Sequence, residues 1–260
     1  MPPTKAKAFP DPNTVVAQLQ LAPRAGRRRG TFITGAGAPP KPRYTILRTN
    51  QVDPYEPQPG DAAIRAAPAA MAVSGDSFKG KKRKAVKISL VKAKLEKFSD
   101  VKALVAKLPS DQDILDLEPR IIKGEDSKRV KEEKRNVRLR GWIYAASRES
   151  DNDFHLIVGR NPKKAPMYLT MEISGLPPSS ASSHKTLKKV RNAYKDFFTD
   201  LPGSGYDFYK PPIPVEIGGP LFFDIQHATG GRVGPADLRD DIPVIWEIHP
   251  VSHLVFEPDE

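Results

Sequence analysis

Five stretches in the second half of the chain are predicted to be β-strands. They lie at residues 137–145, 154–159, 167–174, 215–225 and 244–256. In the first and the third, apolar side chains recur at every second position, which is the period of a strand. Between the third and the fourth, residues 182–198 carry an apolar stripe at helical spacing, formed by Leu187, Val190, Tyr194, Phe197 and Phe198. The order of three strands, one helix and two strands is the feature that most restricts the possible folds.

This order is that of a small Greek-key barrel of the OB type, with its one helix between strands three and four. We therefore predict a mainly β fold with a five-stranded OB-like barrel over residues 136–260. Residues 85–135 are expected to form a connector with a strand near residues 86–90 and two short helices capped at Ser99 or Asp100 and at Ser110. Gly218 and Gly219 indicate a bulge or corner in the fourth strand.

Three short strings resemble an OB-like domain of uncharacterised bacterial proteins. They are DFHLIV at residues 153–158, EISGLP at residues 172–177 and EIHPV at residues 247–251. The resemblance covers about residues 136–256, under half of the chain. It implies the barrel fold and carries no activity to this chain.

The first 84 residues differ sharply in composition from the rest. They hold 15 Lys or Arg against 5 Asp or Glu, whereas residues 85–260 hold 27 against 26. Frequent prolines remove backbone donors, so we predict a long, irregular, basic arm suited to a polyanion or an acidic protein surface, with a solubilising tail as the alternative. Four apolar islands are expected to dock on the body or on a neighbouring subunit: Val15–Val16, Phe32–Ile33, residues 44–47 and residues 66–73.

Cations and aromatic side chains alternate onto one side of the first predicted strand. Single-stranded nucleic acid is held by such cations and by bases stacked on aromatics. The predicted nucleic-acid-binding residues are Arg138, Arg140, Trp142, Tyr144, Arg160, Lys163 and Lys164, with Arg27, Arg28, Arg29, Lys81, Lys82, Arg83 and Lys84 of the arm. The competing interpretation is that the aromatics cover the connector and that the cations, like the lysine face of the helix, are solvated.

These features predict a non-enzymatic module that binds single-stranded or non-specific nucleic acid and needs no cofactor. One alternative is a structural protein whose arm docks on neighbouring subunits of an assembly. Another is a metal-dependent hydrolase that uses His155, Glu247 and His249, with Asp153 and His227 nearby. A purely structural network of hydrogen-bonded polar side chains competes with that last hypothesis.

Several classes of protein are excluded or disfavoured by the sequence. The chain has no cysteine, which excludes disulfides, thiolate metal sites and cysteine nucleophiles. It has no apolar run of ~18 residues and no signal-peptide pattern, so we expect no membrane partner and a cytoplasmic location.

Overall fold

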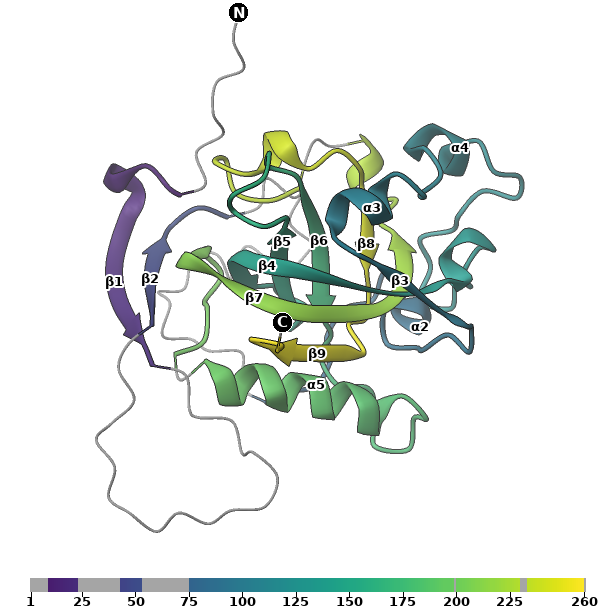
Figure 1. Ribbon diagram of the computed structural model, residues 1–260. Helices are drawn as coiled ribbons and strands as arrows, with labels where there is room; N and C mark the ends of the chain where they lie inside the picture. The colour runs from purple at the N-terminus through teal and green to yellow at the C-terminus, as the bar shows by residue number, and fades with distance from the viewer. Residues whose placement is uncertain (1–8, 23–42, 53–74, 199, 230–232, 260) are drawn as a thin grey trace, which may run out of the picture.

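Nine strands form one mixed sheet in the computed structural model, which describes residues 9–22, 43–52, 75–198, 200–229 and 233–259 (Figure 1). The strands are β1 (Val15–Leu21), β2 (Tyr44–Thr49), β3 (Leu95–Phe98), β4 (Asn136–Arg148), β5 (Phe154–Gly159), β6 (Tyr168–Ile173), β7 (Asp207–Phe223), β8 (Trp246–Ile248) and β9 (His253–Phe256). The helices are α2 (Lys84–Lys87), α3 (Val101–Val105), α4 (Asp111–Leu115) and α5 (His184–Phe197). Short 3-10 turns lie at η1 (Pro12–Thr14), η2 (Glu132–Lys134), η3 (His227–Thr229) and η4 (Arg239–Asp241).

Five of the strands pair in a ring. Their order is β4, β5, β6, β8 and β7, and the pairing of β7 with β4 closes it. Strands β6 and β8 are parallel, while the other neighbours in the ring are antiparallel. Helix α5 lies between β6 and β7 in the chain and runs beside β9 in Figure 1. The predicted succession of three strands, a helix and further strands is therefore confirmed.

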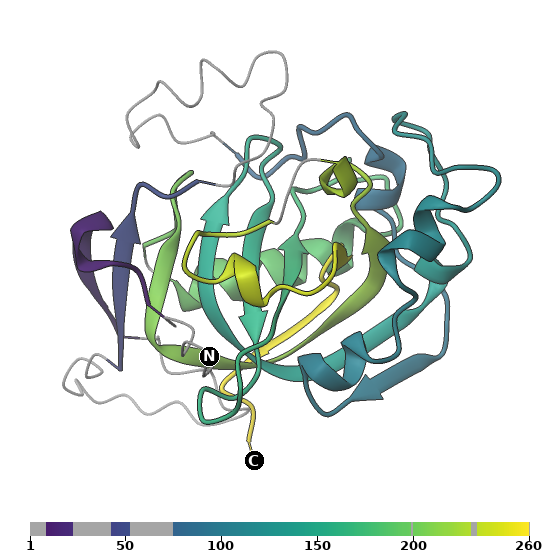
Figure 2. The same ribbon diagram turned by 90° about the horizontal axis from the view of Figure 1, so that it is seen from above.

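The sheet is larger than the predicted five strands, so it is not an isolated barrel. Strand β3 pairs parallel to β4, and β2 and β1 extend the sheet beyond β7 (Figures 1 and 2). The predicted fifth strand is interrupted near Pro250 and becomes β8 and β9, both of which pair with β7. The prediction missed these strand pairings because they join segments that are distant in sequence.

Part of the predicted irregular arm belongs to the sheet. The island Val15–Val16 opens β1, and residues 44–47 lie in β2, where Tyr44 and Ile46 are buried. These two islands thus pair within the chain itself. The islands Phe32–Ile33 and 66–73 lie outside the described residues.

A register shift in β4 changes which side chains share a face. The pairing with both β5 and β7 shifts between Ile143 and Ala145. As a result Ala145 joins Tyr144 in an outer apolar cluster, while Ala146 faces the inner core. The strict alternation predicted for this strand was wrong beyond Ile143, because one extra residue exchanges the two faces.

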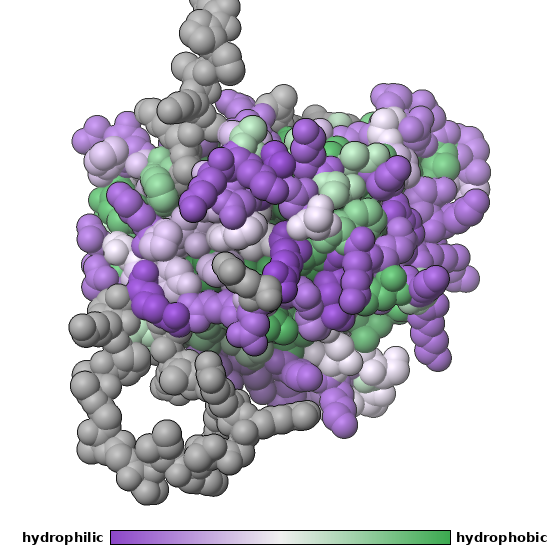
Figure 3. All heavy atoms as spheres, in the orientation of Figure 1, coloured by the Kyte–Doolittle hydropathy of each residue, from purple (hydrophilic) through white to green (hydrophobic). Residues whose placement is uncertain are grey.

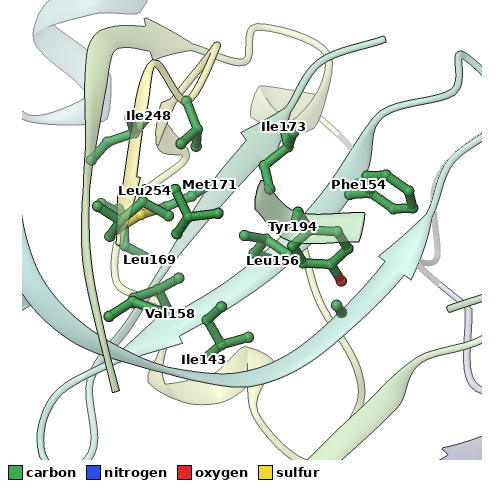
Figure 4. Packing of buried hydrophobic residues seen from close by; sticks show 14 of the residues in the cluster. Ile143, Phe154, Leu156, Val158, Leu169, Met171, Ile173, Tyr194, Ile248 and Leu254 are labelled. Carbon is green, nitrogen blue, oxygen red and sulfur yellow. The ribbon is translucent and has the colours of Figure 1, made fainter. Parts of the chain in front are cut away.

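The inner core fills the ring and the space beneath α5. Leu156 and Val158 of β5, Leu169 and Met171 of β6, and Tyr194 of α5 meet there (Figure 4). The apolar stripe of the predicted helix is buried as expected, and Phe197 stacks on Phe256 of β9 with ring centroids 3.9 Å apart. Burial of these large side chains holds α5 against the ring.

The opposite face of β5 and β6 is covered as well. Ile157 and Tyr168 pack there with Leu238 and Ile242, which lie in and beside the loop that carries η4. All six residues of β5 and all six of β6 are therefore buried. A polar side chain on this outer face must find a partner inside the protein.

The connector differs from its prediction in one element. Residues 84–87 form helix α2, so the strand predicted near residues 86–90 was wrong. The caps at Asp100 and Ser110 are confirmed, since their side chains accept hydrogen bonds from Ala103 N and Asp113 N. Gly218 is not at a bulge, because its pairing with Arg138 is regular, and a Cβ there would lie 2.3 Å from Val137 O.

On the face drawn in Figure 3, hydrophobic residues lie in small patches among hydrophilic ones. Within the described segments, no helix combines the length and the apolar character that crossing a bilayer requires.

Candidate functional site

Acidic and histidine side chains gather on the outer face of the ring, where β5, β6 and β8 lie side by side. His155 of β5 is directly opposite Glu172 of β6, and Glu247 of β8 pairs with Thr170, two residues before Glu172. Inner and outer residues alternate along each strand, so these three side chains emerge on the same face. We call the following residues the acid–histidine cluster: Lys87, Glu149, Asp151, Asp153, His155, Glu172, Asp224, His227, Glu247 and His249.

The turn between β4 and β5 brings three carboxyl groups to the cluster. Asn152 has a φ of 78°, and its side chain donates to the carbonyl oxygens of Gly75 and Ser77. Asp153 is fully buried, and its Oδ1 accepts a hydrogen bond of 2.6 Å from Gly175 N. Glu149 remains the most accessible of the three, with 30% of its side chain exposed.

Two carboxylates approach the same nitrogen of His155. Its Nδ1 lies 3.0 Å from Glu149 Oε1 and 3.3 Å from Glu172 Oε1. An imidazole Nδ1 carries at most one proton, so it cannot donate fully to both oxygens. The three atoms therefore converge as ligands do around a shared cation.

His249 is placed differently. Its Nδ1 lies 2.6 Å from Glu172 Oε2, whereas its Nε2 lies 3.2 Å from Asp153 Oδ2. The two carboxylates thus approach opposite edges of the ring. This arrangement suits a bridging imidazolium better than a ligand shared with both carboxylates.

Two further pairs complete the cluster. Lys87 Nζ lies 3.3 Å from Asp151 Oδ2 and 3.8 Å from Glu172 Oε2. His227 Nε2 lies 3.1 Å from Asp224 Oδ2. Six carboxyl groups thus share one lysine and three histidines in a mostly buried region, where ionised groups need partners.

Burial and mutual repulsion disturb the pKa values of these acids. Burial, with the charge of Asp151, raises the pKa of Asp153 to about 8. Burial and the charge of Glu172 raise the pKa of Glu247 to about 7. Burial also raises the pKa of Glu149.

Glu172 is the exception among the buried acids. Burial acts to raise its pKa, but the charges of Lys87 and His249 outweigh that effect and hold it well below the usual range. In turn, Glu172 and Asp153 hold the pKa of His249 well above its usual value, although burial alone would lower it. Glu172 is therefore ionised at the centre of the cluster.

Two sets of side chains could surround one cation: Glu149, His155 and Glu172, or Asp153, Glu172 and His249. The first set is favoured because both carboxylates face one ring nitrogen. It also reaches solvent through Glu149. In the second set, the two carboxylates face different ring nitrogens of His249. This set is closed to solvent, since each of its side chains is at most 3% exposed.

The residues proposed for a metal from the sequence are all in the cluster, but they do not surround one position. His155 belongs to the first set and His249 to the second. Glu247 Oε2 lies 3.6 Å from His249 Nδ1 and takes part in neither set. Asp153 and His227 lie in the cluster as predicted.

The predicted nucleic-acid face is only partly available. Tyr144 is buried, and its hydroxyl donates to Arg160 O, so it cannot stack on a base. Arg138 lies 3.4 Å from Glu216 Oε1, and Trp142 packs against the outer apolar cluster. Arg140, Lys163 and Lys164 are exposed, while Arg160 is paired with Asp100 at 3.0 Å.

In the arm, Arg83 does not face solvent. It is fully buried and binds both carboxylate oxygens of Glu133, at 2.7 and 2.9 Å. Lys81 is exposed, and Lys82 and Lys84 are half-buried. Arg27, Arg28 and Arg29 lie outside the described residues.

Glu149, Glu172 and Lys87 were missed as cluster residues. Glu172 had a usable signal, because Leu169, Met171 and Ile173 on one face of the strand leave Glu172 on the other. No pattern in the sequence indicates Lys87, since α2 reaches the cluster only through the tertiary fold.

Comparisons with family models, curated proteins and solved structures find no match to this chain.

Proposed function

We propose that the ring of β4, β5, β6, β8 and β7 is an OB-type barrel. Support comes from its pairing order, its closure by β7 with β4, and the place of α5 between its third and fourth strands. Strands β1, β2, β3 and β9 are then additions to the barrel.

On this barrel we infer a metal-dependent hydrolase, with a divalent cation held by Glu149, His155 and Glu172. The observation that carries this inference is the approach of two carboxylate oxygens to the single Nδ1 of His155. Carboxylate and imidazole ligands suit Zn²⁺, Mn²⁺ and related ions.

A second observation is a carboxylate of the same cluster that lacks a partner. Glu247 is 2% exposed, and neither of its carboxylate oxygens makes a hydrogen bond with any described residue. Leaving a buried carboxylate without a donor is costly. A bound cation and its water supply the missing partners.

Three protein ligands leave coordination positions for water and substrate, as in catalytic rather than structural sites. A divalent ion held by Glu149, His155 and Glu172 would supply an activated water and would polarise the scissile group. Hydrolysis would consume one water, and the leaving group would take up a proton as its bond breaks. Glu247 is the carboxylate that lacks a hydrogen-bond donor and is suited to accept a proton from that water.

The remaining residues of the cluster orient Glu172. Its Oε1 faces His155, while its Oε2 faces His249 and Lys87. His249 is held in turn by Asp153, and its backbone carbonyl accepts from Arg129 Nη2 at 3.0 Å. Such outer partners fix a ligand's position and tune its affinity for the ion.

Calorimetric titration of the full chain with Mn²⁺ and with Zn²⁺ tests the site. We expect one ion per chain, and a loss of at least tenfold in affinity for Glu149→Gln and His155→Gln. His253→Gln is the matched control, because His253 Nε2 also pairs with a glutamate, Glu216 Oε1 at 2.8 Å, outside the cluster. Failure of the wild type to bind either ion, or unchanged binding by His155→Gln, would refute the proposal.

A further inference from the structure

A basic segment of the arm lies at the accessible edge of the acid–histidine cluster. Lys79 N donates a hydrogen bond of 2.8 Å to Asp151 O, in the turn that carries Glu149. At the next residue, a Cβ on Gly80 would lie 3.0 Å from Asp151 Cβ. The chain at residues 79–80 is therefore in direct contact with the turn that supplies the most exposed proposed ligand.

Both ends of this segment are anchored to the body. On one side, Asp76 is held by Arg191 at 3.0 Å and by Lys195 at 2.9 Å, and Ser77 forms a bridge with Leu176. On the other side, Arg83 is buried against Glu133. The intervening lysines are thus kept next to the cluster instead of moving freely on a linker.

Two lysines between these anchors are exposed. They are Lys79 and Lys81, and we call these two residues the basic rim. The rim lies at the end of the part of the chain that holds 15 Lys or Arg against 5 acids. A strongly cationic segment therefore ends beside a cluster rich in carboxyl groups, three of whose side chains could hold a cation.

We propose that the substrate of this site is single-stranded nucleic acid, with backbone phosphates on the basic rim and one phosphodiester at the ion held by Glu149, His155 and Glu172. This inference rests on the proposed hydrolase function. Lysines beside a strand neutralise phosphates and fix its position without reading its sequence. A flexible single strand is favoured over a duplex because two of the three proposed ligands, His155 and Glu172, are only 1% and 3% exposed, whereas Glu149 is 30% exposed.

The chemistry is phosphodiester hydrolysis. An ion held by Glu149, His155 and Glu172 would supply an activated water for attack on phosphorus; the bond from phosphorus to the leaving oxygen would break, and that oxygen would take up a proton. The products are a phosphomonoester and a free hydroxyl, and no oxidant or further co-reactant is consumed.

The test compares Lys79→Gln/Lys81→Gln with Lys185→Gln/Lys188→Gln, a control that removes the same charge from exposed positions on α5. Binding and cleavage of a labelled single-stranded DNA and of an RNA of the same sequence are measured with Mn²⁺ between about 50 and 200 mM salt. For the rim variant we expect cleavage to fall at least tenfold and the salt slope to decrease by roughly 1.4, the value for two phosphate contacts on a single strand. The affinity for Mn²⁺ should be unchanged, and the control should behave as wild type.

The outcomes separate this inference from the proposed function. Normal Mn²⁺ binding without binding of either nucleic acid at about 50 mM salt overturns the substrate and leaves the metal site standing. Binding without cleavage shows a partner instead of a substrate and also overturns it. Equal effects of the rim and α5 variants overturn the role of the rim, and faster cleavage of a duplex overturns the choice of a single strand. Absence of Mn²⁺ and Zn²⁺ binding refutes the underlying hydrolase.

Discussion

Glu172 Oε2 lies 2.6 Å from Nδ1 of His249, on the other side of the carboxylate from the oxygen that faces His155. The carboxylate of Glu172 thus connects the buried His249 to the proposed ligand set. Replacing His249 by Gln removes a charged partner from Glu172 without altering a ligand.

For His249→Gln we expect the affinity for Mn²⁺ to fall by about 10- to 100-fold, the usual effect of losing an outer partner of a metal ligand. Titration calorimetry gives the affinity, and thermal unfolding without metal shows whether the variant is folded. Wild-type affinity in a folded His249→Gln would show that Glu172 needs no support from His249.

Replacing the buried Arg191 is expected to cause a large loss of stability. It is fully buried in α5 and donates to Asp76, to Asn152 Oδ1 at 3.0 Å and to Ser174 O at 3.2 Å. Arg191→Met removes all of these hydrogen bonds, although Asp76 keeps Lys195 and Asn152 Oδ1 keeps Arg148, and we expect the free energy of unfolding to fall by about 3 kcal/mol.

The matched control for Arg191 is Lys195→Met, which removes the second partner of the same Asp76. The Lys195 side chain is 36% exposed, so its loss should cost under about 1 kcal/mol. Urea denaturation gives both values. Equal losses would contradict the distinction between a buried and a surface ion pair.

Strands β1 and β2, which lie in the predicted arm, should contribute differently to the stability of the protein. Ile46 of β2 is 1% exposed and packs in the inner core, whereas Val16 of β1 is 55% exposed. We expect Ile46→Ala to lower the free energy of unfolding by about 3 kcal/mol and Val16→Ala to change it by under about 0.5 kcal/mol. A neutral Ile46→Ala, measured in urea, would show that β2 is not part of the folded sheet.

His227 predicts a dependence of stability on pH. Its hydrogen bond and charge interaction with Asp224 outweigh the effect of burial and raise the pKa of His227 to about 9. A raised pKa in the folded state stabilises the protein below pH 6.5, and this stabilisation is lost as the pH rises through about 9. The loss is at most about 3 kcal/mol.

The contribution of His227 is measured as a difference between two proteins. Urea unfolding of wild type and His227→Gln, both with a chelator, is compared at about pH 6 and about pH 9.5. The wild type should be the more stable at the lower pH and should lose this advantage at the higher pH. A constant difference between the two would assign the effect to other groups.

Much of the ring could be predicted from the sequence, because β5, β6 and α5 have clear periods and short connections. Strands β1, β2 and β3 could not, since each joins the sheet through a partner far away in the chain. The faces of Ala145 and Ala146 were exchanged by a one-residue shift that no local pattern indicates.

The same distinction applies to the candidate site. His155 and His249 were identified because histidines at strand ends are conspicuous. Glu149 lies among turn-forming residues, which do not indicate a ligand, and Lys87 lies in a segment whose helix was predicted as a strand. Residues that reach the cluster from loops depend on tertiary packing, which the spacing of residues in the sequence does not record.

Strand β7 is paired with β2, β4, β8 and β9 along its 17 residues. Opening any one of these neighbours leaves the middle of β7 bonded to another. The amide hydrogens in the middle of β7 are therefore expected to exchange with deuterium only when the whole molecule unfolds. This region should be the last part of the protein to lose its structure.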